Sequence, residues 1–259
     1  MAINITFANQ KGGVAKTSTG IVTGQLLFCS NKKVLFVDMD AQGNLSHTLR
    51  AKSSKGTIMD LLSKNKSTQE VIQKTYSGDC ICYSPALSGA DKTLDGLGKE
   101  YLLKEALEQV KDDYSFIIID PPPALGLLTI NALVSSNYVV IPSQADIYSL
   151  QGISQVFLTI DSIKKYCNSS LKISGILLTR FNGHTILSKE LSQLIEDTAQ
   201  KLQTKVFKSR IRECVAVKEA EAGQLSLFKH APKSNASIDY CAFINELIGD
   251  IYAKEKSCK

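Results

Sequence analysis

The stretch Asn9-Gln10-Lys11-Gly12-Gly13-Val14-Ala15-Lys16-Thr17-Ser18 follows the apolar run Ile3–Ala8 and precedes a helix-compatible segment that reaches Cys29. A strand, a glycine-rich turn and a helix in this order are the setting of a phosphate-binding loop. In such a loop, successive backbone N–H groups and the positive N-terminus of the helix hold a polyphosphate. We therefore expect the segment from Lys11 to Ser18 to bind a nucleotide. Lys16 would place its ammonium on the β- and γ-phosphates, and the Thr17 hydroxyl would bind Mg²⁺.

The loop departs from the strict G-x-x-x-x-G-K-[ST] pattern of phosphate loops. Gln10 and Ala15 occupy its two glycine positions, and Lys11 is an additional lysine in front of the pair Gly12-Gly13. Alanine resists the left-handed backbone region that glycine enters easily. We therefore expect a negative φ at Ala15.

Acidic residues follow two further apolar runs. The run Val34–Asp38 continues as Met39-Asp40-Ala41-Gln42-Gly43-Asn44, and the run Phe116–Asp120 continues as Pro121-Pro122-Pro123. Of two carboxylates at i and i+2 on a strand end, one can hold a Mg²⁺-bound water and the other can orient the water that attacks a γ-phosphate. Asp120 is expected near the Mg²⁺, and the prolines stiffen a loop that can sense the γ-phosphate.

Short apolar runs alternate with segments of helical period along the whole chain. Strands are expected at Ile3–Ala8, Val34–Asp38, Phe116–Asp120, Tyr138–Pro142 and Ile173–Thr179. Most of these runs are continuously apolar, which indicates strands buried on both faces. Helices are expected at Thr57–Leu62, Leu97–Lys111, Ile153–Tyr166 and Ile186–Leu202, besides the segment after the phosphate loop. The sequence thus predicts an α/β protein with the P-loop NTPase fold, in which helices flank a mainly parallel sheet on both faces, and residues 1–259 form one domain.

Composition excludes several classes of protein. The 259 residues are 44% hydrophobic and 21% charged, close to the average of globular proteins and unlike disordered, collagen-like or disulfide-scaffold chains. The seven cysteines and three histidines form no pattern typical of a disulfide framework or a zinc site. No targeting segment and no apolar run of about 20 residues is visible. We expect a cytoplasmic protein.

These motifs resemble those of a known protein family. The segment from Lys11 to Thr17 is similar to the deviant Walker A box of the ParA/MinD family of P-loop ATPases, and residues 38–44 are similar to its D-x-D-P-Q-G-N box, with Ala41 in place of proline. The third box has Ala124 where the family commonly has serine, and the likeness extends over essentially the whole chain.

The resemblance implies roles for individual residues. It implies an ATPase that uses ATP and Mg²⁺, in which Lys11 reaches across a nucleotide-sandwich dimer to the partner's phosphates. Asp38 would hold the Mg²⁺-bound water and Asp40 would orient the attacking water. Asn182, near the segment that leads to the family's adenine pocket, is a candidate contact to the base, with a plain turn residue as the equal alternative.

Among the branches of the family, the chain looks like the short Soj-like form, a DNA-partition ATPase of plasmids or chromosomes. This implies an ATP-dependent homodimer that binds double-stranded DNA non-specifically on the nucleoid, and a ParB-like centromere-binding protein that stimulates slow hydrolysis. A MinD-like membrane switch is one alternative, and a cargo-positioning switch without a DNA role is another. An iron–sulfur carrier is not expected, because Cys80 and Cys82 offer no convincing bridging pair.

The C-terminal segment bears on the membrane alternative. A membrane foot would be a basic amphipathic helix. Residues 243–252 carry an apolar stripe, but acidic residues at positions 246, 250 and 255 are interspersed with it. We therefore expect this helix to pack on the domain, and no membrane role.

The net charge of +5 is concentrated in one segment. Residues 201–233 hold eight basic and three acidic side chains, so their balance equals that of the whole chain. In the family the corresponding region lies on the face that grips DNA, and we take Lys208, Arg210, Arg212 and Lys218 as candidate phosphate contacts. Both arginines of the family's motif are replaced here, by Glu213 and Ala216. A solvated basic face is the alternative, and composition alone favours it.

Overall fold

The computed structural model describes residues 1–183 and 186–256, and within them one mainly parallel sheet organises the chain. The strands are β1 Ile3–Phe7, β2 Val34–Asp38, β3 Ile72–Thr75, β4 Gly78–Ile81, β5 Phe116–Asp120, β6 Tyr138–Ser143 and β7 Lys172–Leu178. Their order is β3-β4-β2-β5-β1-β6-β7, and only the β3–β4 pair is antiparallel. This confirms the predicted fold class, although β3 and β4 were not predicted.

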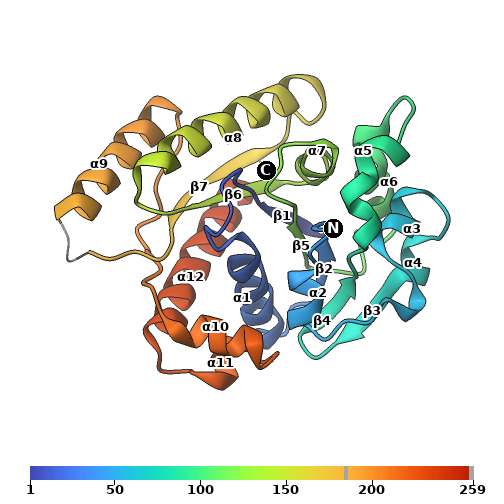
Figure 1. Ribbon diagram of the computed structural model, residues 1–259, viewed down its shortest axis with the longest axis horizontal. Helices are drawn as coiled ribbons and strands as arrows, with labels where there is room; N and C mark the ends of the chain where they lie inside the picture. The colour runs from blue at the N-terminus through green and yellow to red at the C-terminus, as the bar shows by residue number, and fades with distance from the viewer. Residues whose placement is uncertain (184–185, 257–259) are drawn as a thin grey trace.

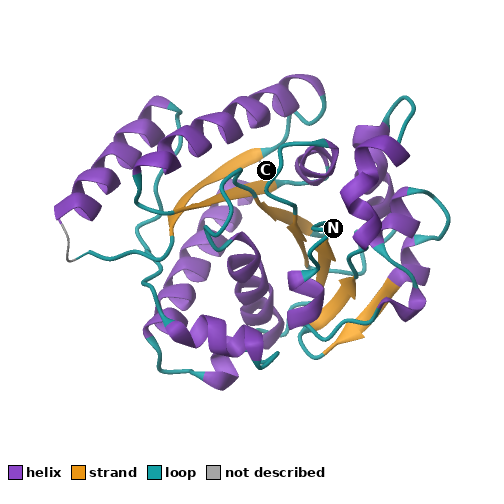
Figure 2. Cartoon of the chain, in the orientation of Figure 1, coloured by secondary structure: helices purple, strands orange, loops and turns teal. Residues whose placement is uncertain are grey.

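The helices cover both faces of the sheet (Figures 1 and 2). They are α1 Lys16–Cys29, α2 Asn44–Thr48, α3 Ile58–Leu62, α4 Thr68–Val71, α5 Ala90–Thr93, α6 Leu102–Glu108, α7 Leu127–Val134, α8 Ile147–Tyr166, α9 Ile186–Lys201, α10 Val215–Ala222, α11 Leu227–His230 and α12 Asn235–Lys256. Single 3₁₀ turns lie at Ser53–Lys55, Pro85–Gly89 and Lys99–Tyr101. Helices α1 and α12 pack on one face of the sheet, whereas α3, α6, α8 and α9 pack on the other.

The continuously apolar strands are buried on both faces, as predicted. Alternate residues of a strand point to opposite sides of the sheet. In β5, Phe116 and Ile118 belong to the core shared with α1 and α12, whereas Ile117 and Ile119 belong to the core shared with α3 and α6. All four are at most 1% exposed, so this central strand is fixed by packing from both sides.

One predicted helix starts too early. A helix was expected from Leu97, but the α-helix begins only at Leu102, after the 3₁₀ turn Lys99–Tyr101. Leu97 is fully exposed, and Gly98 has a φ of 79°, which interrupts a right-handed helix. The apolar stripe predicted for the helix is nevertheless buried at Leu103 and Leu107.

The apolar stripe of α12 packs into the protein. Phe243, Leu247 and Ile251 are completely buried, and the ring of Phe243 meets that of Phe207 edge-on, with 5.0 Å between centroids. This confirms the expected packing of the last helix on the domain. Among the described residues, no helix is both long and apolar enough to cross a membrane.

We predict that Gly24 is required for the approach of α1 to the sheet. A Cβ atom there would lie 2.3 Å from ring atoms of Phe36, which is fully buried, so Gly24→Ala should lower the free energy of unfolding by about 1–3 kcal/mol. Gly249→Ala in α12 is the matched control, since its Cβ meets no described atom within 4 Å and a gain of about 0.5–1 kcal/mol is expected. Urea unfolding measures both, and equal stabilisation of the two variants would contradict the packing described.

Candidate nucleotide-binding site

A cavity of about 390 Å³ opens beside the phosphate loop, and many of the predicted site residues line it. Its lining consists of Gly12, Gly13, Ala15, Lys16, Thr17, Ser18, Asp40, Asn44, Pro123, Thr179, Arg180, Ile211, Arg212, Glu213, Cys214, Val217, Lys218, Glu221 and Tyr240. These residues follow the carboxyl ends of parallel strands, lie on α1, α2, α10 and α12, or belong to the segment just before α10. Ligands of open α/β sheets bind in this position, outside the carboxyl ends of the strands.

The phosphate loop turns through two left-handed residues. Gly13 has a φ of 75°, and a Cβ atom at Gly12 or Gly13 would meet no described atom within 4 Å, which leaves room for a ligand against the backbone. Ala15 has φ 61° and ψ 34°, so the prediction of a negative φ was wrong. Ala15 is the N-cap of α1, and its carbonyl accepts the first helical hydrogen bond from Thr19. The left-handed conformation costs an alanine roughly 1–2 kcal/mol, a strain that loop anchoring must offset.

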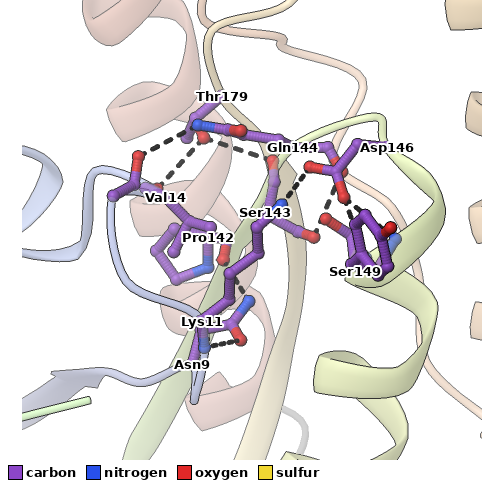
Figure 3. A network of polar contacts seen from close by, with 11 residues as sticks. Asn9, Lys11, Val14, Pro142, Ser143, Gln144, Asp146, Ser149 and Thr179 are labelled. Atoms are coloured by element: carbon purple, nitrogen blue, oxygen red, sulfur yellow. Dashed lines mark hydrogen bonds and ion pairs between the residues drawn. The ribbon is translucent and has the colours of Figure 1, made fainter.

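Three side chains anchor the loop to strands β1, β6 and β7 (Figure 3). Gln144 donates to the carbonyl of Gly13 at 2.9 Å, and Thr179 donates to the carbonyl of Val14 at 3.1 Å. Asn9 accepts from the backbone N–H of Lys11 at 3.0 Å and donates to the carbonyl of Pro142 at 2.7 Å. The backbone of the loop is therefore held from both ends.

Lys16 is a buried cation that faces the cavity. Lys16 is only 8% exposed, and its Nζ donates to the carbonyl of Lys11 at 3.3 Å. Burial lowers the pKa of Lys16, while the carboxylates of Asp120 and Asp40 act in the opposite direction. Within the described residues Lys16 forms no ion pair, so an anionic group in the cavity would compensate its charge.

Thr17 and Asp120 form a pair of oxygen ligands at the cavity. The Thr17 hydroxyl donates to Oδ2 of Asp120 at 2.8 Å, whereas the buried Oδ1 of Asp120 has no hydrogen-bond partner in the described part of the chain. Burial, together with the charge of Asp38, raises the pKa of Asp120 to about 8. An unpartnered carboxylate oxygen beside a hydroxyl fits Mg²⁺, which prefers hard oxygen ligands and keeps places for phosphates and water. No three His, Cys, Asp or Glu residues of the described chain form a metal site by themselves.

Asp38 and Asp40 differ in their surroundings although they are two residues apart. Asp38 is fully buried, and its Oδ2 accepts from the backbone N–H of Ser46 at 2.8 Å and from its hydroxyl at 2.7 Å. Burial raises the pKa of Asp38 to about 6 against the effect of these hydrogen bonds. Asp40 instead lines the cavity and accepts from the backbone N–H of Gln42 at 3.0 Å. Sequence reasoning missed Ser46, because its contact follows from the turn into α2.

The far wall of the cavity comes from the C-terminal third of the chain. Ile211 and Val217 provide apolar surface, and Tyr240 closes the bottom with its hydroxyl 3.3 Å from that of Thr19. Glu221 lines the cavity together with Ser18, and burial raises its pKa. Asn182 is exposed and does not line the cavity, so its contact to the base stays a prediction.

Lys11 is absent from this lining, in contrast to Lys16. Its ammonium forms an ion pair with Asp146, in the loop between β6 and α8 (Figure 3). The structure thus separates the two lysines of the loop, placing one under the cavity and the other outside its wall.

Ion pairs neutralise three of the eight basic side chains of residues 201–233. Arg210 pairs with Glu196 of α9 at 2.8 Å, and Arg212 binds Asp239 of α12 through two nitrogens, at 2.9 and 2.7 Å. Lys205 pairs with two acidic residues of α12. Lys208 and Lys218 are exposed and form no ion pair with the described residues, and Lys218 also lines the cavity.

The chain is similar to a known protein family and to several known proteins. The family model described as AAA domain matches residues 2–173. The chain is 37% identical to the sporulation initiation inhibitor protein Soj of Bacillus subtilis over 94% of its length and 97% of the relative's. It is 35% identical to the chromosome partitioning protein ParA of Myxococcus xanthus, over 94% of its own length and 87% of the relative's.

Among solved structures, the crystal structure of a cobyrinic acid a,c-diamide synthase from Mycobacterium smegmatis with bound ADP and magnesium is similar in fold. The TM-score is 0.83 at 30% identity, and the match covers 96% of this chain and 94% of the other. These likenesses span nearly the full length of the chains.

We predict that Asp120 destabilises the ligand-free protein at high pH. Because its folded pKa of about 8 lies above the ordinary 3.8, the folded state binds the extra proton, and stability falls as the pH rises from about 4 to 8. Asp120→Asn cannot ionise, so its stability relative to wild type should rise by about 2 kcal/mol or more between pH 5 and pH 8. Urea unfolding in EDTA measures this, with the exposed Asp113→Asn as control; a difference independent of pH would refute the prediction.

Proposed function

The chain belongs to the ParA/Soj family of partition ATPases, and on this basis we propose that it is a DNA-partition switch that cycles between monomer and ATP-bound dimer. The observation that carries the proposal is that the two lysines of the phosphate loop lie in different places. Lys16 is buried under the cavity, whereas Lys11 projects outside its lining. A second lysine placed so is available to a nucleotide bound by another subunit.

The nucleotide chemistry is assigned to the cavity residues. The phosphates of ATP would lie on the backbone of Gly12, Gly13, Val14, Ala15 and Ser18, with the ammonium of Lys16 as counter-charge. Thr17 and Asp120 would hold Mg²⁺ directly and Asp38 through a water. When bound, Mg²⁺ neutralises charge on the β- and γ-phosphates.

Asp40 is assigned to the attacking water because, unlike Asp38, it lines the cavity. In the proposed cycle hydrolysis is slow while the site of one subunit is incomplete, and a partner accelerates it by completing the site. In this proposal Lys11 of each subunit completes the other's site, and a ParB-like centromere-binding protein stimulates hydrolysis. Such gating suits a timing switch better than a metabolic enzyme.

DNA binding is proposed for the basic segment, through phosphate contacts that carry no sequence information. Arg210 and Arg212 already have acidic partners, so of the four candidate contacts only the exposed Lys208 and Lys218 are without an ion pair to the described residues. The dimer would present these residues twice and so bind the nucleoid.

The structure bears differently on the two alternative functions, a membrane switch and a cargo-positioning switch. A MinD-like membrane foot is disfavoured, because the apolar side chains of α12 are buried in the hydrophobic core and are not available to insert into a membrane. A cargo-positioning switch uses the same nucleotide site and differs only in the absence of DNA binding, so the DNA experiment below decides between them.

We predict that Asp40→Ala traps the dimer. Without the group that orients water, hydrolysis should fall by about 100-fold or more, while phosphate binding by Lys16 is retained. Light scattering with Mg²⁺-ATP should therefore find a persistent dimer of Asp40→Ala, and Lys16→Ala, which loses the phosphate counter-charge, should stay monomeric. If Asp40→Ala remains monomeric in saturating ATP, the proposed mechanism is wrong.

For DNA, we predict that Lys208→Ala/Lys218→Ala weakens ATP-dependent binding of unrelated duplexes equally and reduces the slope of log K against log salt by about 1 per lost phosphate contact. Lys32→Ala is the matched control, because Lys32 is exposed between α1 and β2, at the amino ends of the parallel strands. The measurement is fluorescence anisotropy over a salt series. An unchanged slope would reject these contacts, no binding at low salt would favour the cargo switch, and binding to anionic vesicles instead would favour the membrane switch.

A further inference from the structure

Asp146 links the phosphate loop to the start of α8. Its carboxylate forms an ion pair with Nζ of Lys11, 135 residues away, and both side chains are about 30% exposed (29% and 31%) (Figure 3). The pair therefore lies at the protein surface but is partly shielded from water.

The two oxygens of Asp146 have separate partners. Oδ1 accepts from the backbone N–H groups of Tyr148 and Ser149, at 3.0 and 3.1 Å, which makes Asp146 the N-cap of the 20-residue helix α8. Oδ2 accepts from Lys11. Because the cap fixes the carboxylate, Oδ2 is presented to Lys11 without further loss of side-chain freedom, which strengthens an ion pair relative to one between two mobile side chains.

Only the side chain of Lys11 can change partner. Its backbone N–H is bound to Asn9, and the neighbouring carbonyl of Gly13 is bound to Gln144 from the same β6–α8 loop that carries Asp146. One ammonium cannot lie on Asp146 and on the phosphates of another subunit at the same time. The contact to Asp146 therefore competes with any contact that Lys11 makes in a dimer.

We propose that Asp146 is the positioning residue of Lys11, which it retains in its own subunit until a nucleotide of a second subunit competes for the ammonium. Asp146 thereby sets the protein concentration at which the nucleotide-bound dimer forms. The inference rests on the proposed function, because it assumes that Lys11 acts across a dimer.

The size of the effect follows from the symmetry of a dimer. A partly exposed ion pair shifts an equilibrium by up to about five-fold. Two such pairs must open when two subunits associate, so the dimer dissociation constant should be raised by up to about 25-fold, the product of the two factors.

Asp146→Asn separates the two functions of this residue. Asparagine is as good an N-cap as aspartate, so α8 keeps its cap, but the charge that holds Lys11 is lost. Asp146→Ala removes both. The dimer dissociation constant is measured by light scattering or sedimentation over a dilution series with Mg²⁺ and AMPPNP, which excludes hydrolysis. Nucleotide affinity of the monomer and its thermal midpoint are recorded for each variant.

We expect Asp146→Asn to lower the dimer dissociation constant by about 2- to 25-fold, with the thermal midpoint close to that of wild type. The difference from wild type should shrink as salt screens the ion pair. An unchanged or raised dissociation constant for Asp146→Asn would overturn the proposal, since a merely structural cap predicts a defect in Asp146→Ala alone.

A double-mutant cycle distinguishes failure of this inference from failure of the proposed function. Lys11→Gln, Asp146→Asn and the double variant are compared by the unfolding free energy of the nucleotide-free monomer, which needs no dimer. No coupling between the two positions would overturn the role of Asp146 whatever the dimer does. Coupling in a wild-type protein that never dimerises would overturn both the dimer and the competition, and leave a purely structural pair.

Discussion

Charge that is buried without full compensation, at the carboxyl ends of β1, β2 and β5, is the constraint on which the structure depends. Lys16, Asp38 and Asp120 are each at most 8% exposed, and Oδ1 of Asp120 has no partner within the described chain. Such groups cost free energy unless a ligand or a rigid frame compensates them. The frame is the central sheet, whose strands are packed from both sides, and Ser46 and Thr17 hold the two carboxylates in place.

The sequence predicted those parts of the site that depend on local order. A loop between a strand and a helix, or an aspartate at the end of four apolar residues, has a position fixed by its neighbours, so Lys16, Thr17, Asp38 and Asp120 could be placed near one cavity in advance. The parallel strands followed from the same continuity of apolar residues. The hairpin β3–β4 escaped detection because its strands are four residues long and partly polar, as in Gln73 and Lys74.

Contacts between distant segments could not be foreseen. Tyr240 meets Thr19 across 221 residues, and Lys11 meets Asp146 across 135. The left-handed Ala15 belongs to the same class, since its conformation is fixed by hydrogen bonds from Gln144 and Thr179 to the neighbouring carbonyls rather than by its own preference. For the same reason the net charge of a segment does not predict how much of that charge is uncompensated. Residues 201–233 are strongly basic in sequence, but Arg210 and Arg212 form ion pairs with acidic residues of α9 and α12.

The replaced arginines of the family acquire a physical meaning in this structure. In the resemblance drawn from the sequence, Glu213 takes the place of a family arginine; it pairs with Arg180 at 2.7 Å, and both residues line the cavity. The cavity thus carries an internal ion pair in place of a free cation, while five of the eight basic side chains of residues 201–233 have no ion pair with the described residues. Because the logarithm of non-specific DNA affinity scales with the number of phosphate contacts, a dimer that presents the same basic side chains twice binds DNA much more tightly than a monomer. In the proposed function DNA binding would therefore depend on the dimer, and the proposed competition between Asp146 and the partner's phosphates for Lys11 would act directly on that dependence.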